Sequence, residues 1–316
     1  MNTNQSELHV VFGTGPLGLA VMRELLRQGK KVRMVNRSGQ AETPADVEVC
    51  PADVSQPEQA RQASQGASVV YQCAQPPYYQ WLEKFPTLQR NILEGAASTG
   101  AKLVVADNLY LYGQVQGPIR EDSPVAPCSR KGRVRAEMAA EVLASHSSGK
   151  VRATIGRSSD FFGPFVDGSS AGDRMFGFAV NGKAAEGHGK LDLPHTYTFI
   201  DDFGKALVIL GEREEALGQA WHVPSPRTVT TRQFIELIFK ELGKPVKLTG
   251  MGHGMMWMAG LFVPEARETV EMMYEFEYPF VMDHSKFTQA FGDHATPLEN
   301  AIGQTVNWYR QNYVAK

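Results

Sequence analysis

The chain lacks several features that would assign it to a specialised class of protein. It has only three cysteines in 316 residues, Cys50, Cys73 and Cys128, with no CxxC pair, so we expect neither a disulfide framework nor a metal site but a reducing cytoplasm. No run approaches the roughly 18 apolar residues of a membrane span, and no signal peptide is visible. The formal net charge of −2 provides no attraction for nucleic acid or anionic membranes. The expected partner is a small molecule.

The first half of the chain alternates between short apolar runs and segments with helical spacing. Leu17, Val21 and Leu25 repeat every four residues, as on one face of a helix. Strand–helix alternation predicts a Rossmann-type doubly wound parallel sheet with helices on both faces. The predicted strands cover 9–12, 32–35, 47–50, 69–73, 103–106 and 151–155.

After Phe161 the alternation loosens. Glycine, aspartate and proline at 163–172 and 182–194 predict loops. Helices are expected over 201–210, 231–242, 265–274 and 297–309, with Thr231 as the N-cap residue of the second. We therefore expect residues 1–160 to form mainly a nucleotide-binding core. Residues 161–316 are expected to form mainly a smaller substrate-side lobe, interleaved with the last strands and helices of that core.

A glycine-rich turn is the strongest local signal. It follows the first predicted strand, opens a predicted helix and reads Gly13, Thr14, Gly15, Pro16, Leu17, Gly18. In such a turn the first glycine allows the tight bend, the second lets the backbone approach a pyrophosphate, and the third lets helix pack on strand. The unpaired amides at the helix start then face the phosphate. The turn predicts dinucleotide binding.

The end of the second predicted strand indicates which dinucleotide is preferred. A carboxylate commonly binds the ribose 2′-hydroxyl of NAD there, whereas this chain has Asn36, Arg37 and Ser38. A guanidinium can hold a 2′-phosphate, so NADP(H) is predicted over NAD(H). Asp53, just after the third strand, has two interpretations: a contact with the adenine amino group, or a cap at a helix start before Pro57.

Further segments, in order along nearly the whole chain, resemble the short-chain dehydrogenase/reductase superfamily in its extended, epimerase/dehydratase-like form. They include VVADNLYLYG at 104–113, RSSDFFGP at 157–164, HTYTFIDD at 195–202 and a typical C-terminal finish at 283–309. The resemblance implies cofactor contacts from Cys73, Ala74, Gln75 and Ser158. It also implies a homodimer, paired through helices at 81–98 and 131–145.

The catalytic set of that family is not conserved in this chain. Asn108 stands where the resemblance implies Ser or Thr, Ser129 where it implies the catalytic tyrosine, and Arg133 where it implies the lysine. Asn108 can still polarise a carbonyl oxygen, and Arg133 can bind ribose or phosphate. Serine is a poor acid at neutral pH, so the usual proton donor is missing.

Other hydroxyl groups are candidates for that proton. Tyr110 lies two residues after Asn108, and Tyr78 and Tyr79 follow the fourth predicted strand. The alternative for each tyrosine is a place in the aromatic wall of a substrate pocket. Ser129 could itself act if a neighbour such as Lys131 relays protons.

On the substrate side, His195 stands where sugar-nucleotide enzymes of the family carry a phosphate-binding arginine, and Asp160 replaces their asparagine. A carboxylate repels a diphosphate, which favours a neutral or cationic small substrate. The alternative for Asp160 is a hydrogen-bonded structural role. No histidine or carboxylate spacing indicates a metal site.

Three functions follow as hypotheses. The first is an NADP(H)-dependent oxidoreductase acting on a small, fairly apolar carbonyl or hydroxyl compound. The second is an NADP(H)-binding sensor that has lost the chemistry, and the third is an epimerase or dehydratase with a reordered site.

Overall fold

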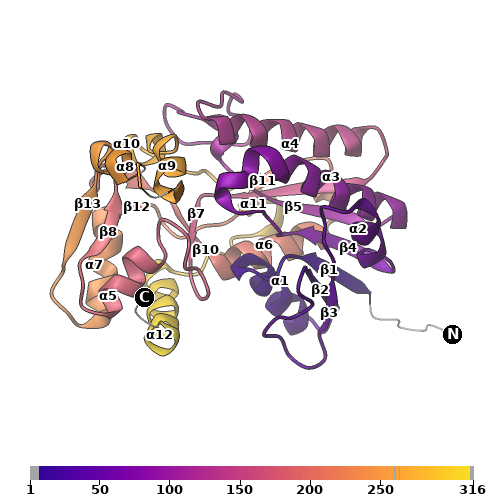
Figure 1. The fold of residues 1–316 in the computed structure, drawn as a ribbon, viewed down its shortest axis with the longest axis horizontal. Coiled ribbons are helices and arrows are strands. Elements are labelled where there is room, and N and C mark those ends of the chain that lie inside the picture. The colour runs from indigo at the N-terminus through magenta and orange to yellow at the C-terminus, as the bar shows by residue number, and fades with distance from the viewer. Residues whose placement is uncertain (1–6, 260, 263, 314–316) are drawn as a thin grey trace. The chain divides into compact units, whose positions relative to one another are not determined.

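The chain folds into two compact units (Figure 1). The structure, a computed structural model, describes residues 7–259, 261–262 and 264–313. The first unit comprises residues 1–107, 134–157 and 203–221, and the second comprises 108–133, 158–202 and 222–316. The chain therefore passes from one unit to the other five times.

A seven-stranded sheet forms the centre of the first unit, in the order β3-β2-β1-β4-β5-β6-β11. The β1–β2, β2–β3, β1–β4 and β4–β5 pairs are parallel. The strand order reverses beside β1, as in the Rossmann-type doubly wound fold, so the predicted fold class is confirmed. The strands are β1 (Leu8–Phe12), β2 (Lys31–Asn36), β3 (Glu48–Pro51), β4 (Ala67–Gln72), β5 (Lys102–Asn108), β6 (Arg152–Ser158) and β11 (Ala220–His222).

Helices cover both faces of this sheet (Figure 1). On one face α6 packs on α1, where a Cβ on Gly204 would lie 2.7 Å from the Ala20 Cβ. On the other face Ala63, Ile92 and Val142 of α2, α3 and α4 share one apolar core with the strands. The helices are α1 (Pro16–Arg27), α2 (Pro57–Ala63), α3 (Trp81–Thr99), α4 (Arg130–Ser147) and α6 (Ile200–Glu212), with short 3-10 helices at Tyr78–Gln80 and Glu214–Ala216.

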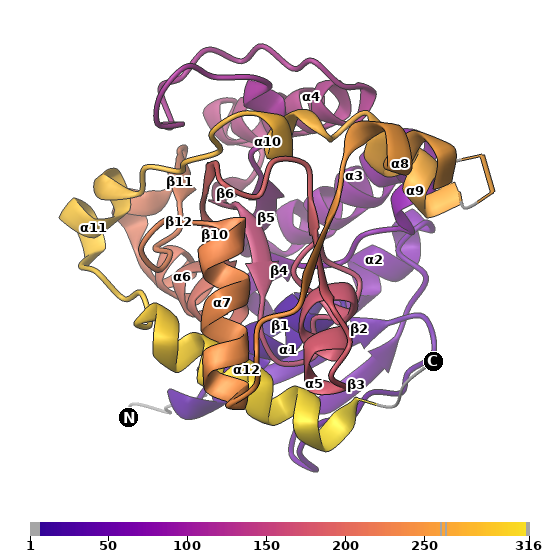
Figure 2. The ribbon, with the colours of Figure 1, turned by 90° about the vertical axis from the view of Figure 1, so that its left-hand side faces the viewer.

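The second unit packs helices and two-stranded sheets around an aromatic core. Phe162, Phe176, Phe234 and Tyr309 are fully buried in that core. Figure 2 shows α7 and α12 side by side over it. The strand pairs are β7–β10, β9–β12 and β8–β13. The elements are β7 (Asp160–Phe162), α5 (Phe178–Val180), β8 (Ala185–His188), β9 (Pro194–His195), β10 (Tyr197–Phe199), β12 (Val229–Thr230), α7 (Thr231–Leu242), β13 (Leu248–Met251), α8 (His253–Ala259), α9 (Pro264–Val270), α10 (Tyr274–Glu277), α11 (Ser285–Phe291) and α12 (Leu298–Asn312), with a 3-10 helix at Tyr110–Tyr112 and a π-helix at Asp173–Gly177.

Three local predictions in this unit were wrong. The N-cap residue of α7 is Thr230, which forms a capping box with Gln233, so Thr231 is already helical. The expected loop at 182–194 contains β8, whose partner β13 lies about 60 residues further on, beyond the reach of local patterns. The helix expected over 265–274 ends at Val270, next to Glu271, whose carboxylate accepts the backbone N–H of Arg130.

No helix within the described ranges is both long and apolar enough to cross a membrane.

Candidate functional site

The glycine turn in the first unit joins β1 to α1. Gly13 has a φ of +106°, and a Cβ there would lie 2.7 Å from the backbone nitrogen of Ala74. A Cβ on Gly18 would lie 2.0 Å from the Gly13 carbonyl oxygen. A Cβ on Gly15, by contrast, would meet nothing within 4 Å. The first and third glycines are therefore required by packing, whereas the second faces open space at the N-terminus of α1.

Asn36, the last residue of β2, connects this turn to the segment that follows β2. Its amide nitrogen donates to Thr14 Oγ1 at 2.9 Å and to the Gln40 carbonyl at 2.7 Å, and its oxygen accepts the Gly39 N–H at 2.7 Å. Arg37 and Ser38 lie in the turn that Asn36 organises, and both side chains are exposed. The side chain of Asn36 thus has a structural role in shaping the candidate 2′-phosphate site.

Asp53 lies just beyond β3. Its carboxylate accepts the Ser55 N–H at 3.0 Å, and α2 has Gln56 as its N-cap residue, so Asp53 does not cap this helix. The hydrogen bonds from Ser55, helped by the charge of Arg37, hold the pKa of Asp53 below its usual range.

The end of β4 lies beside the glycine turn. The Cys73 N–H donates to the Phe12 carbonyl at 2.9 Å, and burial raises the pKa of the Cys73 thiol far above its usual range, which rules out a reactive thiolate. Gln72 is buried, and its amide nitrogen and oxygen have no hydrogen-bond partner among the described residues. We did not predict Gln72, although an amide that ends an apolar strand is a visible signal. Ala74 is half-buried and Gln75 is exposed.

The two tyrosines after β4 also belong to the first unit and begin a 3-10 helix. The ring of Tyr78 contacts the ring of Trp81 edge-on, with centroids 4.9 Å apart. Tyr79 is 52% exposed. Tyr79 is therefore the more accessible hydroxyl of the pair.

Asn108 and Tyr110 begin the second unit. The Asn108 side-chain oxygen accepts the Tyr110 N–H at 3.2 Å. Tyr112 is buried and its hydroxyl bonds His222 Nε2 at 3.0 Å. Tyr112 therefore has a structural role.

The segment at the start of α4 lacks a proton donor with suitable chemistry. Ser129 is buried, and its hydroxyl accepts the Gly132 N–H at 3.0 Å, as an N-cap residue does. Arg133 is exposed. Lys131 is fully buried and forms ion pairs with Glu268 and, at 2.9 Å, with Glu271. The Lys131 ammonium is therefore held by two carboxylates.

The structure brings together two residues that we predicted separately for the substrate. His195 Nε2 lies 2.8 Å from Asp160 Oδ2, with the histidine side chain 3% and the aspartate side chain 15% exposed. The His195 ring stacks on Phe276 and Phe280, with centroids 5.2 and 5.3 Å apart. Asp160 is therefore the more accessible member of the pair. Ser158 is buried at the end of β6.

One buried ion cluster in the first unit was missed. Asp107 accepts Arg135 Nε at 2.8 Å and Arg157 Nε at 2.9 Å. The Arg135 guanidinium also lies over the rings of Phe85 and Trp81, 4.7 and 5.7 Å from their centroids. The cluster joins the ends of β5 and β6 to α4, and Asp107 immediately precedes Asn108 in the chain.

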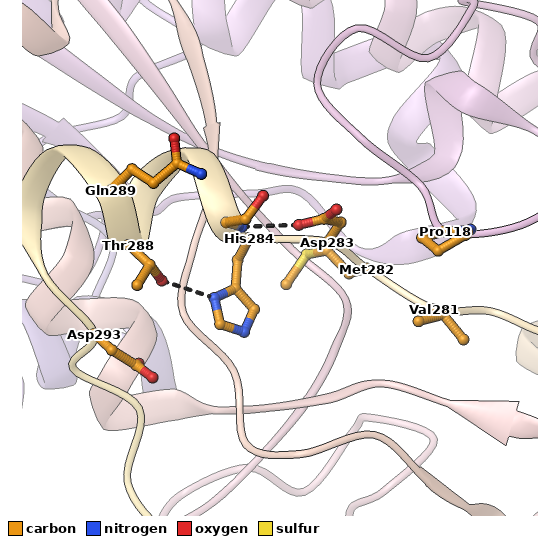
Figure 3. A pocket seen from close by; sticks show the side chains of 9 residues that line it. Pro118, Val281, Met282, Asp283, His284, Thr288, Gln289 and Asp293 are labelled. Atoms are coloured by element: carbon orange, nitrogen blue, oxygen red, sulfur yellow. Dashed lines mark hydrogen bonds between the residues drawn. The ribbon is translucent and has the colours of Figure 1, made fainter.

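The second unit also has a surface pocket of about 500 Å³ beside α11 (Figure 3). In it His284 Nδ1 bonds Thr288 Oγ1 at 3.2 Å, and the Asp283 carboxylate accepts the Ser285 N–H at 2.8 Å. Both bonds are local to the start of α11, and none of the predicted site residues is among those that line the pocket. Over the residues that can be described, no group of three or more histidine, cysteine or carboxylate side chains is arranged to hold a metal ion.

Comparison with known proteins identifies the family of the chain. The model of the NAD dependent epimerase/dehydratase family matches residues 10–223, and the chain belongs to that family. No curated protein matches the chain. Among solved structures, the dTDP-glucose 4,6-dehydratase of Bacillus anthracis in complex with NAD superposes with a TM-score of 0.79, at 15% identity over 97% of both chains. The UDP-glucose 4-epimerase of Thermotoga maritima also has a TM-score of 0.79, at 16% identity over 96% of this chain and 99% of that one. Such low identities establish the shared fold alone.

Proposed function

We propose that this protein is an NADP(H)-dependent oxidoreductase that acts on a small, fairly apolar carbonyl or hydroxyl compound. The observation that carries the proposal is the glycine turn. Gly13 and Gly18 are too tightly packed for any side chain, while the position of a Gly15 side chain is open at a helix N-terminus. That is the space a pyrophosphate needs. The unpaired amide of the neighbouring Gln72 adds a buried polar group that a cofactor would satisfy.

When bound, the nicotinamide supplies or accepts hydride. In this chain Gly13 to Gly18 would hold the pyrophosphate. Asn108 would donate a hydrogen bond from its amide nitrogen to the substrate oxygen, as an oxyanion donor does. Asp160, paired with His195, would contact the substrate on the other side.

Asp160 also bears on the substrate class. Among the described residues, the hydrogen-bond partner of its carboxylate is the His195 imidazole, and no arginine or lysine forms an ion pair with it. Such a carboxylate repels the diphosphate of a sugar nucleotide. Relatives titled as sugar-nucleotide enzymes therefore share the fold, while the proposed substrate is neutral or cationic.

The cofactor preference depends on Arg37, the exposed guanidinium after Asn36. Replacing Arg37 by alanine is expected to weaken NADPH binding roughly 10- to 100-fold, because a charge-assisted contact to the 2′-phosphate is lost. NADH binding should not change. Calorimetric titration of both cofactors measures this, with Arg61→Ala, another exposed arginine, as the control. Equal losses for NADPH and NADH would contradict the proposed role of Arg37.

The glycine cradle gives a second test. Gly15 has a φ of −76°, which alanine adopts easily, so Gly15→Ala should change the free energy of unfolding by no more than about 1 kcal/mol. It should nevertheless weaken NADPH binding tenfold or more, because the methyl group takes the space of a phosphate oxygen. Gly18→Ala is the matched contrast, in which stability should also fall. Unchanged NADPH affinity in Gly15→Ala would show that no cofactor uses this turn.

A sensor without catalysis is the second candidate, favoured by the capping role of the Ser129 hydroxyl. An assay of NADPH oxidation with a panel of aldehydes, ketones and lactones distinguishes the oxidoreductase from the sensor. Turnover of one compound supports the oxidoreductase. Tight NADPH binding without any turnover supports the sensor.

A further inference from the structure

The helix α8 and the turn that follows it expose a group of large apolar side chains. The described part of the chain has nine exposed large apolar residues, and five of them lie here, each 47–86% exposed. They are Met255, Trp257, Met258, Leu261 and Phe262, and we call them the apolar patch. Exposed apolar residues that are scattered singly are common in proteins, whereas a group within eight positions of the sequence marks a contact surface.

The apolar patch is large for a single protein chain. Aromatic side chains have roughly 150–250 Å² of surface each, so the exposed fractions of the five residues correspond to about 600 Å² of apolar area. The largest apolar patch of a typical monomer measures roughly 300–600 Å² and often has a function. The sequence from Gly254 to Pro264 has no charged residue, so no charged side chain interrupts the patch.

The helix α8 is apolar on both of its faces. On the inner face Met256 is 4% exposed and belongs to a buried cluster with Met273 and Phe276. On the outer face Met255 and Met258, three residues apart, are exposed neighbours. A helix that is apolar all round is normally covered on every side. The inner face of α8 is covered by the second unit, and the outer face is not covered by any of the described residues.

The segment that carries the patch is anchored at both ends. Before the patch, β13 pairs in parallel with β8 as far as Met251. After it, two carboxylates meet two cations at the start of α4. Glu268 and Glu271 both pair with the fully buried Lys131, and Glu271 also lies 3.4 Å from Arg130 Nε. A surface that is fixed in advance loses little conformational freedom when it binds, which favours association.

The other charged groups beside the patch are also balanced. His253 Nδ1, at the start of α8, lies 3.2 Å from a carboxylate oxygen of Glu277. Beyond the patch the sequence has Glu265 and the exposed Arg267, which carry opposite charges. An anionic membrane attracts clusters of roughly four to eight basic residues, and no such cluster occurs between His253 and Arg267. Two copies of a surface with balanced charges, by contrast, do not repel each other.

We propose that the apolar patch is the surface through which two copies of this chain associate. In a twofold dimer both copies use the same patch, so that an apolar surface meets an apolar surface. About 600 Å² from each copy gives about 1,200 Å² in total, which reaches the lower limit of a stable, specific interface. Methionine and aromatic residues are enriched in the cores of interfaces, and charged residues are depleted there. The composition of the patch therefore fits such a core.

This surface differs from the helices at 81–98 and 131–145, through which the family resemblance predicts a homodimer. A chain that used both surfaces would form a tetramer, and loss of the patch would leave a dimer. A chain that used the patch alone would form a dimer, and loss of the patch would leave a monomer. In both cases the mass of the assembly is halved.

Analytical ultracentrifugation of the whole chain compares the wild type with the double variant Trp257→Ser, Phe262→Ser. Because aromatic residues dominate the binding energy of interface cores, the dissociation constant should rise at least about 100-fold and the mass should be halved. Both side chains are exposed in the single chain, so the variant should keep the circular dichroism spectrum of the wild type. Val246→Ser, at an exposed apolar residue outside the patch, is the control and should not change the mass. A monomeric wild type, or a mass that the double variant does not change, would overturn the proposal.

The fluorescence of Trp257 reports on the contact directly. Trp81 and Trp221 are buried, whereas Trp257 is 56% exposed in the single chain. When the wild-type assembly is diluted until it dissociates, its emission should shift to longer wavelength, because Trp257 passes into water. Trp257→Phe keeps an aromatic side chain, so this variant should still associate but should lack the shift. Dissociation of the wild type without any shift would mean that the copies meet elsewhere, and the proposal would fail.

Lipid vesicles test a different occupant of the apolar patch. The wild-type protein is centrifuged with vesicles of phosphatidylcholine and phosphatidylglycerol, and it should stay in the supernatant. Sedimentation with the vesicles that is lost in the variant Trp257→Ser, Phe262→Ser would show that the patch binds a membrane, and it would overturn the dimer contact. None of these three measurements uses a cofactor or a substrate, so their results do not depend on the proposed oxidoreductase function.

Discussion

Each unit of the molecule contains a buried carboxyl group, and the two groups differ in the partners that surround them. Asp107, in the first unit, is bonded by the guanidinium groups of Arg135 and Arg157. Glu275, in the second, is 2% exposed, and its Oε1 has no hydrogen-bond partner among the described residues. The first carboxyl is stabilised as an anion by two cations, whereas the second is stabilised as a neutral acid by burial.

The difference shows that burial alone does not decide the charge of a carboxyl group. A buried anion requires partners that replace its lost hydration, and Asp107 has them. Without such partners burial favours the neutral form, and it raises the pKa of Glu275 above its usual range. Asp107 has a structural role, because its two arginine partners connect the ends of β5 and β6 to α4.

The largest expected effect is on Asp107. Replacing it by asparagine leaves two buried guanidinium groups without their countercharge, which should lower the free energy of unfolding by about 3–5 kcal/mol. Urea unfolding followed by circular dichroism measures this change. Asp192→Asn is the control, because Asp192 makes a similar pair with Arg232 at the surface, and its unfolding midpoint should not move. If the two variants have similar unfolding midpoints, the buried Asp107 cluster stabilises the fold no more than the exposed Asp192–Arg232 pair does.

A buried imidazole extends the comparison to pH. Burial, and then the charge of Lys30, lower the pKa of His9 in β1 to about 4. Between pH 6.5 and pH 4 the unfolded chain therefore binds a proton that the folded chain does not, so stability falls with falling pH, by up to about 3 kcal/mol. The dependence is opposite to that of Glu275, whose contribution is lost as pH rises above about 4.5.

Chemical denaturation at several pH values tests the role of His9. His9→Asn keeps a polar group near the Tyr71 hydroxyl, which lies 3.2 Å from His9 Nδ1, but it does not titrate. The variant should therefore lack that part of the acid dependence. If the slope between pH 6.5 and pH 4 persists in His9→Asn, another group is responsible for it.

Much of the fold was predictable because its signals are local. Apolar runs of the right length marked the first six strands of the sheet, each within three residues at either end. β11 and β8 were not predicted, because their runs are short and their partners are distant in the chain. The split between α9 and α10 coincides with contacts that Glu271 makes to Arg130 and Lys131, about 140 residues earlier.

The parts of the candidate site that belong to a sequence motif could be predicted. The parts that form only when distant segments pack together could not. The glycine turn and the Asn36 segment were selected from the spacing of residues in the sequence. Asp160 and His195 were selected separately, but their contact depends on β7 and β9 folding into one unit. Glu275 has no sequence signal, since only its burial distinguishes it from the partly exposed Glu271 and Glu277 nearby.

The five crossings between the units have a consequence for synthesis on the ribosome. The first unit cannot complete its sheet until β11 has been made, and by then the second unit has been translated to His222. A nascent chain that stops after β6 therefore presents that strand with an open edge, a template for pairing with another chain. Folding of the two units is thus interleaved in time as well as in sequence, and neither unit is a fragment that can be cut out and produced alone.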